Sequence, residues 1–345
     1  MKNRFEKFSK LWAVFLWLLL LINSSCKDEQ AMNSENLKVS EHFAGNSVES
    51  KAPHSILSDI LFTNEGDLAT LERDTGRITI FRDGLEKRSF VYETAQKQPI
   101  EATAFYEKDG IFSVLNVKDA ALTRWTKTGK LVAQDSIVPP VFSNRVAFST
   151  NGDFYSSAEG VRQNKFILHY DERGQLLDTL GTNTAATIRS SADYSIAQEL
   201  AQGRIPDALQ DSILLATKDE RVYVLHRSKP ILQCYAGRQL LIEKPVNIQE
   251  LAEIREAVQV RNRVLTVENH YIPLSYWNDF AIGDDGSLFV LLALQTRPVI
   301  YKLSSDGEIL GRFTGEPGKG HLLAVAKGKI AVADALSGLV TVYAI

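Results

Sequence analysis

A turn sequence that returns at a near-constant interval predicts an all-β fold for this chain of 345 residues, a six-bladed β-propeller. The interval, the hairpin signals beside the turns and an incomplete last unit all support this fold class. In the clearest copies a short apolar segment leads into a turn of Asp, Asn or Glu followed by Gly, at residues 61–67, 147–153 and 281–287.

The spacing of the turns gives the number of units. The first turn of each unit ends at a position that is usually glycine: Gly66, Gly110, Gly152, Glu220, Gly286 and Gly328. The steps between these positions are 44, 42, 68, 66 and 42 residues. Because a four-stranded blade takes about 40–50 residues, the two long steps indicate insertions of roughly 20–25 residues. Six units therefore fit between Lys51 and Ile345, the range that we assign to the propeller.

The segments beside the turns have strand composition. Residues 165–170 and 298–303 are rich in β-branched and aromatic side chains, and each reaches a turn at Gly174 or Gly307. The run 288–294 is apolar throughout, which is typical of a strand covered on both faces, as the middle strands of stacked blades are.

The last unit is one strand short. Residues 321–325, 329–333 and 339–343 predict three strands, and the sequence ends at Ile345. A missing strand would leave an unpaired sheet edge. We therefore expect a segment within 37–56 to pair beside 339–343 and to close the ring.

The two insertions predict short helices between blades 3 and 4 and between blades 4 and 5. The first covers about 182–211, with a helix starting near Ser191. The second covers about 248–276, where apolar residues recur at helical spacing as Ile248, Leu251, Ile254 and Val258. Both insertions precede inner strands, so one interpretation places them around the mouth of the central channel. The alternative is that they pad the blade edges.

The N-terminal sequence predicts export and lipid attachment. A basic start is followed by 12 apolar residues, 11–22, too few for a spanning helix, which needs about 20. Asn23-Ser24-Ser25 then precedes Cys26 and resembles a lipobox, although Asn23 stands where that motif usually has Leu. We expect a signal peptide at 1–25, lipidation of Cys26 and a disordered tether at 26–50. An ordinary secretory signal with an incidental Cys is the alternative.

Together, the repeated turns and this N-terminus resemble the six-bladed β-propeller lipoproteins of the NHL/TolB-like type found in Bacteroidota. The resemblance implies a protein of the cell envelope, anchored in the outer membrane. Lys27-Asp28-Glu29 resembles the signal that exports such lipoproteins to the cell surface, or it is a solvated linker. The family is functionally diverse, so the resemblance implies a fold more firmly than an activity.

The amino-acid composition limits the classes of partner that we expect. Without residues 1–25, Lys+Arg falls from 39 to 35 and Asp+Glu from 42 to 41, which gives a net charge of −6. A mildly acidic domain without basic clusters argues against nucleic acid. The partners that we expect are a membrane, reached through the lipid on Cys26, and an unidentified protein or small-molecule ligand. Of the two cysteines, Cys234 lies in a strand pattern and is interpreted as a buried apolar residue.

The candidate site residues are polar side chains at the entry to the inner strands. They are Asp59, Glu101, Asn144, Arg145, Asp279 and His321. A ring of this composition suits a polar small molecule or a divalent cation such as Ca²⁺, and ordinary strand-start chemistry is the alternative. No catalytic residue and no metal motif is identified by spacing. The sequence therefore favours a ligand- or protein-binding module, with a metal-dependent hydrolase or lactonase using the channel carboxylates and His321 as the alternative.

Overall fold

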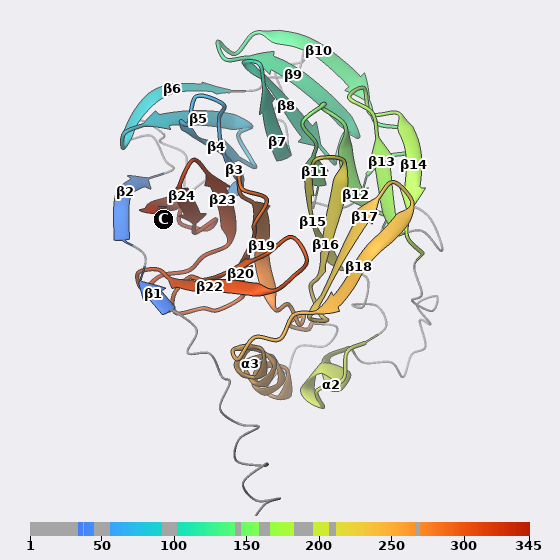
Figure 1. Ribbon diagram of the computed structural model, residues 1–345. Helices are drawn as coiled ribbons and strands as arrows, with labels where there is room; N and C mark the ends of the chain where they lie inside the picture. The colour runs from blue at the N-terminus through green and yellow to red at the C-terminus, as the bar shows by residue number, and fades with distance from the viewer. Residues whose placement is uncertain are drawn as a thin grey trace, which may run out of the picture.

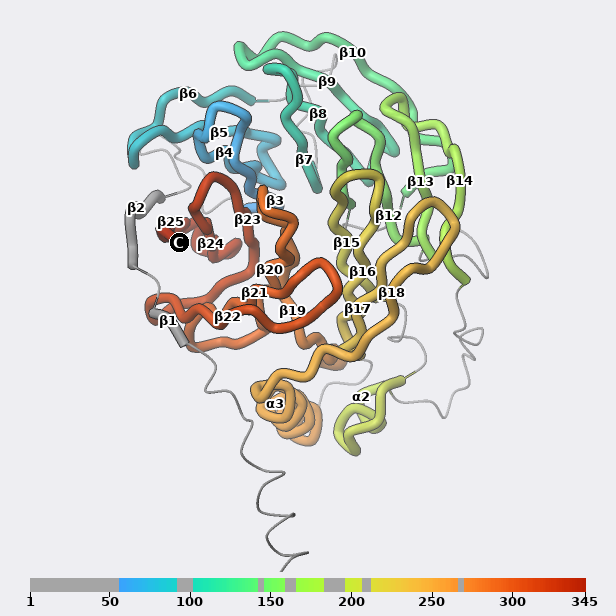
Figure 2. Tube along the Cα trace, viewed as in Figure 1, coloured from blue at the N-terminus to red at the C-terminus, as the bar shows by residue number. Residues whose placement is uncertain are grey.

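The computed structural model describes residues 34–36, 38–44, 56–91, 102–141, 146–158, 166–182, 196–206, 212–265 and 270–345. Six sheets stand around a common centre as the blades of a β-propeller, which confirms the predicted fold class (Figure 1). Figure 2 shows the same ring as a trace. None of the helices within these ranges is long and apolar enough to cross a membrane.

Blades 1 to 3 each contain four strands in chain order from the centre outward. Blade 1 has β3 (Leu57–Phe62), β4 (Leu68–Glu72), β5 (Arg77–Arg82) and β6 (Leu85–Val91). Blade 2 has β7 (Ala102–Lys108), β8 (Ile111–Asn116), β9 (Ala121–Thr126) and β10 (Leu131–Ser136). Blade 3 has β11 (Val146–Phe148), β12 (Phe154–Ser157), β13 (Ile167–Tyr170) and β14 (Leu176–Leu180).

The remaining blades carry the helices and the ring closure. Blade 4 has β15 (Ile213–Lys218), β16 (Arg221–His226), β17 (Ile231–Ala236) and β18 (Gln239–Pro245). Blade 5 has β19 (Trp277–Ile282), β20 (Leu288–Leu292), β21 (Val299–Leu303) and β22 (Ile309–Thr314). Blade 6 has β23 (Leu322–Ala326), β24 (Lys329–Ala333) and β25 (Leu339–Ala344). Within the described ranges the helices are α2 (Ile196–Ala201), before blade 4, and α3 (Leu251–Arg263), before blade 5, as predicted.

The N-terminal segment closes the ring. β2 (Lys38–Ala44) pairs antiparallel with β25 and becomes the outer strand of blade 6, which confirms the predicted closure. β1 (Ser34–Asn36) pairs parallel with β22 and adds a fifth strand to blade 5. Both strands lie inside the range 26–50 that was expected to be a disordered tether, so that expectation is wrong for 34–36 and 38–44. The reason is that pairing with exposed edges supplies the backbone hydrogen bonds that a polar segment cannot make alone.

Apart from β1, which runs parallel to β22, neighbouring strands within each blade are antiparallel, so the ring has two distinct ends. We call the end that holds the blade-to-blade connections the connection face, and the end that holds the turns between inner and second strands the hairpin face. α2 and α3 lie on the connection face (Figure 1). The middle strands are buried on both sides, as expected for the apolar run in β20, where every residue is buried.

On the hairpin face, lysines of the even blades hold the turns of the odd blades. Lys108 of blade 2 donates to the carbonyl of Asn151 in blade 3 at 2.9 Å. Lys218 of blade 4 donates to that of Gly283 in blade 5 at 2.9 Å, and Lys327 of blade 6 donates to Asn64 in blade 1. These contacts fix the odd-blade turns, which are the three clear copies of the sequence motif.

Candidate functional site

Two of the predicted channel carboxylates act as clips between neighbouring blades. Asp59 on β3 accepts the backbone N–H of Ile60 on Oδ1 at 2.9 Å. Its Oδ2 accepts the N–H of Phe105 on β7, in blade 2, at 3.1 Å. Because a carboxylate accepts backbone N–H groups well, this contact joins the inner strands of blades 1 and 2.

Asp279 repeats this arrangement in blade 5. Its Oδ1 accepts the N–H of Phe280 at 2.9 Å, and its Oδ2 accepts the N–H of Leu323 on β23, in blade 6, at 2.7 Å. Both oxygens of each carboxylate are therefore engaged by the backbone. This geometry favours a structural role for Asp59 and Asp279 over metal binding.

His321 has a partner of its own on the connection face. Its Nδ1 lies 3.0 Å from Oδ1 of Asp334, in the loop between β24 and β25. Burial acts to raise the pKa of the Asp334 carboxyl, but hydrogen bonds from the Ser337 side chain and the Leu336 N–H outweigh it and lower that pKa. The pair holds a loop of blade 6 beside the start of β23.

The other candidate residues, Glu101, Asn144, Arg145 and Cys26, lie outside the described residues. Within the described ranges, no three side chains of His, Cys, Asp and Glu form a group that could hold a metal ion. The channel-mouth site therefore stays a prediction.

The helix α3 is fastened to blade 5. Glu250, just before the helix and 7% exposed, accepts hydrogen bonds from the Tyr301 hydroxyl at 2.7 Å and from Nε of Arg312 at 2.9 Å. Burial acts to raise the pKa of the Glu250 carboxyl, but these two donors outweigh it and lower that pKa. Ile254 and Val258 are buried in the same apolar cluster as blades 4 and 5. These contacts favour the interpretation that the second insertion packs against blade edges.

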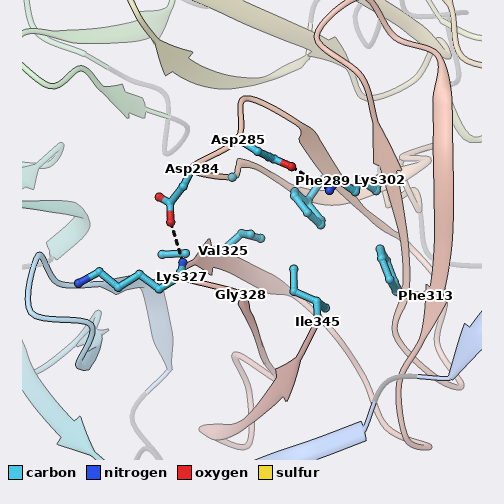
Figure 3. Close-up of a pocket in the computed structure, with 11 residues that line it drawn as sticks. Asp284, Asp285, Phe289, Lys302, Phe313, Val325, Lys327, Gly328 and Ile345 are labelled. Carbon is cyan, nitrogen blue, oxygen red and sulfur yellow. Dashed lines mark hydrogen bonds and ion pairs between the residues drawn. The ribbon is translucent and has the colours of Figure 1, made fainter.

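A cavity of about 370 Å³ lies between blades 5 and 6 on the hairpin face (Figure 3). We call it the blade 5–6 cavity. Apolar side chains from four segments form its floor: Phe289 of β20, Phe313 of β22, Val325 of β23 and Ile345. A volume above about 300 Å³ and an apolar lining with a few polar groups are typical of small-molecule sites.

The turn between β19 and β20 forms the polar rim of this cavity. Asp285 Oδ2 accepts a hydrogen bond from Nζ of Lys302 at 2.9 Å. Asp284 Oδ2 accepts the backbone N–H of Lys327 at 2.7 Å. The Lys302 hydrogen bond is the main cause that lowers the pKa of the Asp285 carboxyl to about 2, helped by the N–H of Ser287. Asp285 is therefore an anion at any physiological pH.

Gly283 borders the cavity at a point where there is no space for a side chain. A Cβ placed there would lie 3.0 Å from Cε2 of Phe289, 3.1 Å from Oδ1 of Asp285 and 3.6 Å from Cγ1 of Val325. The corresponding position in blade 1 is Thr63, a residue that is 3% exposed. The absence of a side chain at 283 thus lets Phe289 and Asp285 pack closely against the turn.

A second cavity, of about 490 Å³, lies on the other side of the same turn, between blades 4 and 5. Its lining is more polar and includes Lys218, Arg221, Tyr223, Ser287 and Ser304. Asp285 borders both cavities. Both lie on the face opposite to the one on which the sequence analysis placed its candidate residues.

The residues of the blade 5–6 cavity were not selected from the sequence. The turn 281–287 was recognised as a repeat, and its acidic pair was interpreted as turn chemistry. One signal was available, because Gly283 stands where the other two clear copies have Thr63 and Ser149. The contribution of Phe313 and Val325 depends on register and blade packing, which one sequence does not specify.

Comparisons with known proteins give the fold and no family. No protein-family model and no curated protein matches the sequence. Among solved structures, the WD40 domain of Pan2 from Neurospora crassa matches at 11% identity with a TM-score of 0.53, over 91% of this chain and 96% of that one. A streptogramin B lyase matches at 11% identity and a TM-score of 0.49, over 86% of this chain and 85% of that one. At this identity the match to the Pan2 domain supports the propeller architecture alone.

Proposed function

We propose that this protein is a lipid-anchored, extracytoplasmic β-propeller that works as a binding module, with the blade 5–6 cavity as its ligand site. The observation that carries the proposal is the cavity itself, an apolar floor of about 370 Å³ beneath a charged rim on a turn held from both sides. Lys218 of blade 4 and the backbone of Lys327 in blade 6 fix that turn. A preformed site of this kind binds without paying to order a loop.

The binding role is tested by filling the cavity. A small-molecule fragment library is screened by ligand-observed NMR against the wild-type protein and against Gly283→Thr, which introduces the side chain found at Thr63. We expect the hits to be lost in Gly283→Thr and in Phe313→Ala, which removes part of the floor. Melting curves show whether each variant is folded. Hits that bind both folded variants as well as they bind wild type would contradict this site.

Anchoring is tested separately. The basic start, the short apolar run and Cys26 motivate the proposal of cleavage before Cys26 and acylation of its thiol. Metabolic labelling with a fatty acid should label the wild-type chain, and Cys26→Ala should abolish the label and leave the precursor uncleaved. Cys234→Ala is the matched control, because Cys234 is buried and should not affect labelling. Equal labelling of Cys26→Ala and wild type would rule out this anchor.

A further inference from the structure

We infer that the blade 5–6 cavity takes a small amphipathic cation, a ligand with an apolar body and a protonated amine. The inference rests on the proposed binding function and adds the chemical class of the ligand. The apolar body would lie on Phe289, Phe313 and Val325, and the amine would lie at the rim beside Asp284.

The first argument is the charge of the rim. Asp284 and Asp285 are neighbours on the turn. Nζ of Lys302 forms an ion pair with Oδ2 of Asp285 at 2.9 Å. The Lys327 side chain also borders the cavity, but its Nζ points away and donates to Asn64 in blade 1 (Figure 3). Asp284 receives a backbone N–H, which carries no net charge. With Nζ of Lys327 turned away, the side chains that line the cavity thus carry one carboxylate more than they carry ammonium groups. Nζ of Lys218, which is outside the lining, donates to the backbone carbonyl of Gly283 at 2.9 Å.

The second argument is that the protein already places an ammonium at this site. Nζ of Lys302 lies 5.5 Å from the ring centre of Phe289 as well as within hydrogen-bond distance of Asp285. A cation is attracted by the face of an aromatic ring and by a carboxylate beside it. The position of Lys302 thus shows that an ammonium group fits between the aromatic ring and the carboxylate at this rim.

The third argument is the contrast with neighbouring sites. The cavity between blades 4 and 5 is lined by Lys218 and Arg221 beside Asp219, and its Asp285 is already paired with Lys302, so this lining carries no excess negative charge. In blade 1 the equivalent turn has its acids neutralised by Arg82 and by two lysines. The combination of an apolar floor and excess negative charge is therefore specific to the blade 5–6 cavity among these three places.

The test uses three probes that share one phenyl body: 2-phenylethylammonium, 2-phenylethanol and 3-phenylpropanoate. Their affinities for the purified wild-type protein are measured by NMR titration at low ionic strength. We expect the ammonium to bind at least about threefold more tightly than the alcohol, since a partly exposed ion pair and a cation–ring contact each contribute modestly. The carboxylate should bind most weakly.

Two variants should change the affinity in opposite directions for a cationic ligand and for an anionic ligand. Asp284→Asn should weaken the binding of 2-phenylethylammonium severalfold. Lys302→Met should strengthen that binding, because the Lys302 ammonium no longer pairs with Asp285. Asp178→Asn and Lys244→Met make the same charge changes at the Asp178–Arg238 and Lys244–Glu308 pairs, away from the cavity, and should leave binding within about twofold.

The outcomes separate the ligand class from the proposed function. If the alcohol or the carboxylate binds best and Gly283→Thr abolishes that binding, the cavity is the site and the amine class is wrong. If Lys302→Met weakens the binding of 2-phenylethylammonium, the proposal that the ligand is an amine is wrong as well. If no probe binds wild type, or if binding is unchanged in Gly283→Thr, both the ligand class and this binding site are overturned.

Discussion

Blades 1 and 5 are built on one backbone plan. Their first turns close with the same hydrogen bonds, from Thr63 N to Asp67 O at 2.8 Å in blade 1 and from Gly283 N to Ser287 O at 2.9 Å in blade 5. Each blade also carries an Asp clip at the third residue of its inner strand, next to a register shift. Differences between the two blades therefore come from side chains and from strand edges.

In blade 1, side chains fill the space at the first turn and pair with its acidic residues. Thr63 fills its own position and its Oγ1 accepts the N–H of Asp67 at 3.2 Å. Asp67 pairs with Arg82 at 2.6 Å, and Lys127 pairs with Glu65 at 2.7 Å. The Thr63 side chain occupies the space at this turn, and the cations pair with its acidic side chains. These contacts favour a structural role for the turn.

In blade 5 the same turn is open and acidic. Gly283 has no side chain and borders the blade 5–6 cavity, and Lys302 pairs with Asp285 but not with the neighbouring Asp284. The comparison teaches that a repeat motif fixes the backbone of a turn, whereas the function of each copy depends on substitutions at a few positions within it.

The largest expected effect concerns the strand edges. Blade 5 has a fifth strand, β1, which blade 1 lacks, while β2 completes blade 6. Deleting residues 27–36 removes only β1 and should cost about 1–2 kcal/mol. Deleting 27–44 also opens the ring and should cost on the order of 4 kcal/mol or more, because β25 loses its partner along its whole length. Urea denaturation measures both, and equal stability of the two deletions would show that β2 does not close the ring.

The next effect tests whether the two clips are equivalent. Asp59→Ala and Asp279→Ala should each lower the free energy of unfolding by about 2–3 kcal/mol, because each leaves two backbone N–H groups without their carboxylate acceptor. Asp178→Ala is the control, since Asp178 bonds the N–H of its own neighbour Thr179 and the exposed Arg238. We expect that control to cost less than about 1 kcal/mol. A loss as small as the control's at either Asp would show that the clip there is not needed.

The sequence was sufficient for the architecture and insufficient for the site. Period, turn residues and the missing last strand are local signals, so they predicted six blades, both helices and the strand that closes blade 6. The clip role of Asp59 was hidden, because a register shift between Leu57 and Asp59 changes which way a side chain points and leaves no mark on composition.

The cavity was hidden for a different reason. Its floor joins Phe289, Phe313 and Val325, which come from three strands in two blades. Strand patterns predict that such residues are buried, but they do not predict which of them leave a gap. The gap follows from packing, and the informative residue, Gly283, is one whose side chain is missing.

A third prediction converts the blade 1 turn toward that of blade 5. Thr63→Gly removes a buried side chain and its hydrogen bond to Asp67 and adds backbone freedom to the unfolded chain, so we expect a loss of about 2 kcal/mol. We expect no binding of 2-phenylethylammonium there, because Arg82 and Lys127 still neutralise the acids. Urea denaturation measures the first effect and NMR the second. Binding of the ammonium at the altered turn would show that space alone, without excess charge, makes the site.

The smallest effect tests the charge of the blade 5 turn through pH. Lys302 is the main cause that lowers the pKa of Asp285 from 3.8 to about 2. A carboxyl whose pKa is lower in the folded state stabilises the protein above its unfolded pKa, and that stability is lost as pH falls from about 4 to about 2. Because the Asp285 side chain is 56% exposed, the contribution should be only about 1 kcal/mol. Lys302→Met should therefore be less stable than wild type by about that amount at pH 6, and most of the difference should be lost near pH 2, where Asp285 is about half protonated in the folded wild type. Unfolding in urea at both pH values measures it, and a difference that is the same at pH 2 as at pH 6 would show that Lys302 stabilises the blade through packing on Phe289 and not through its charge.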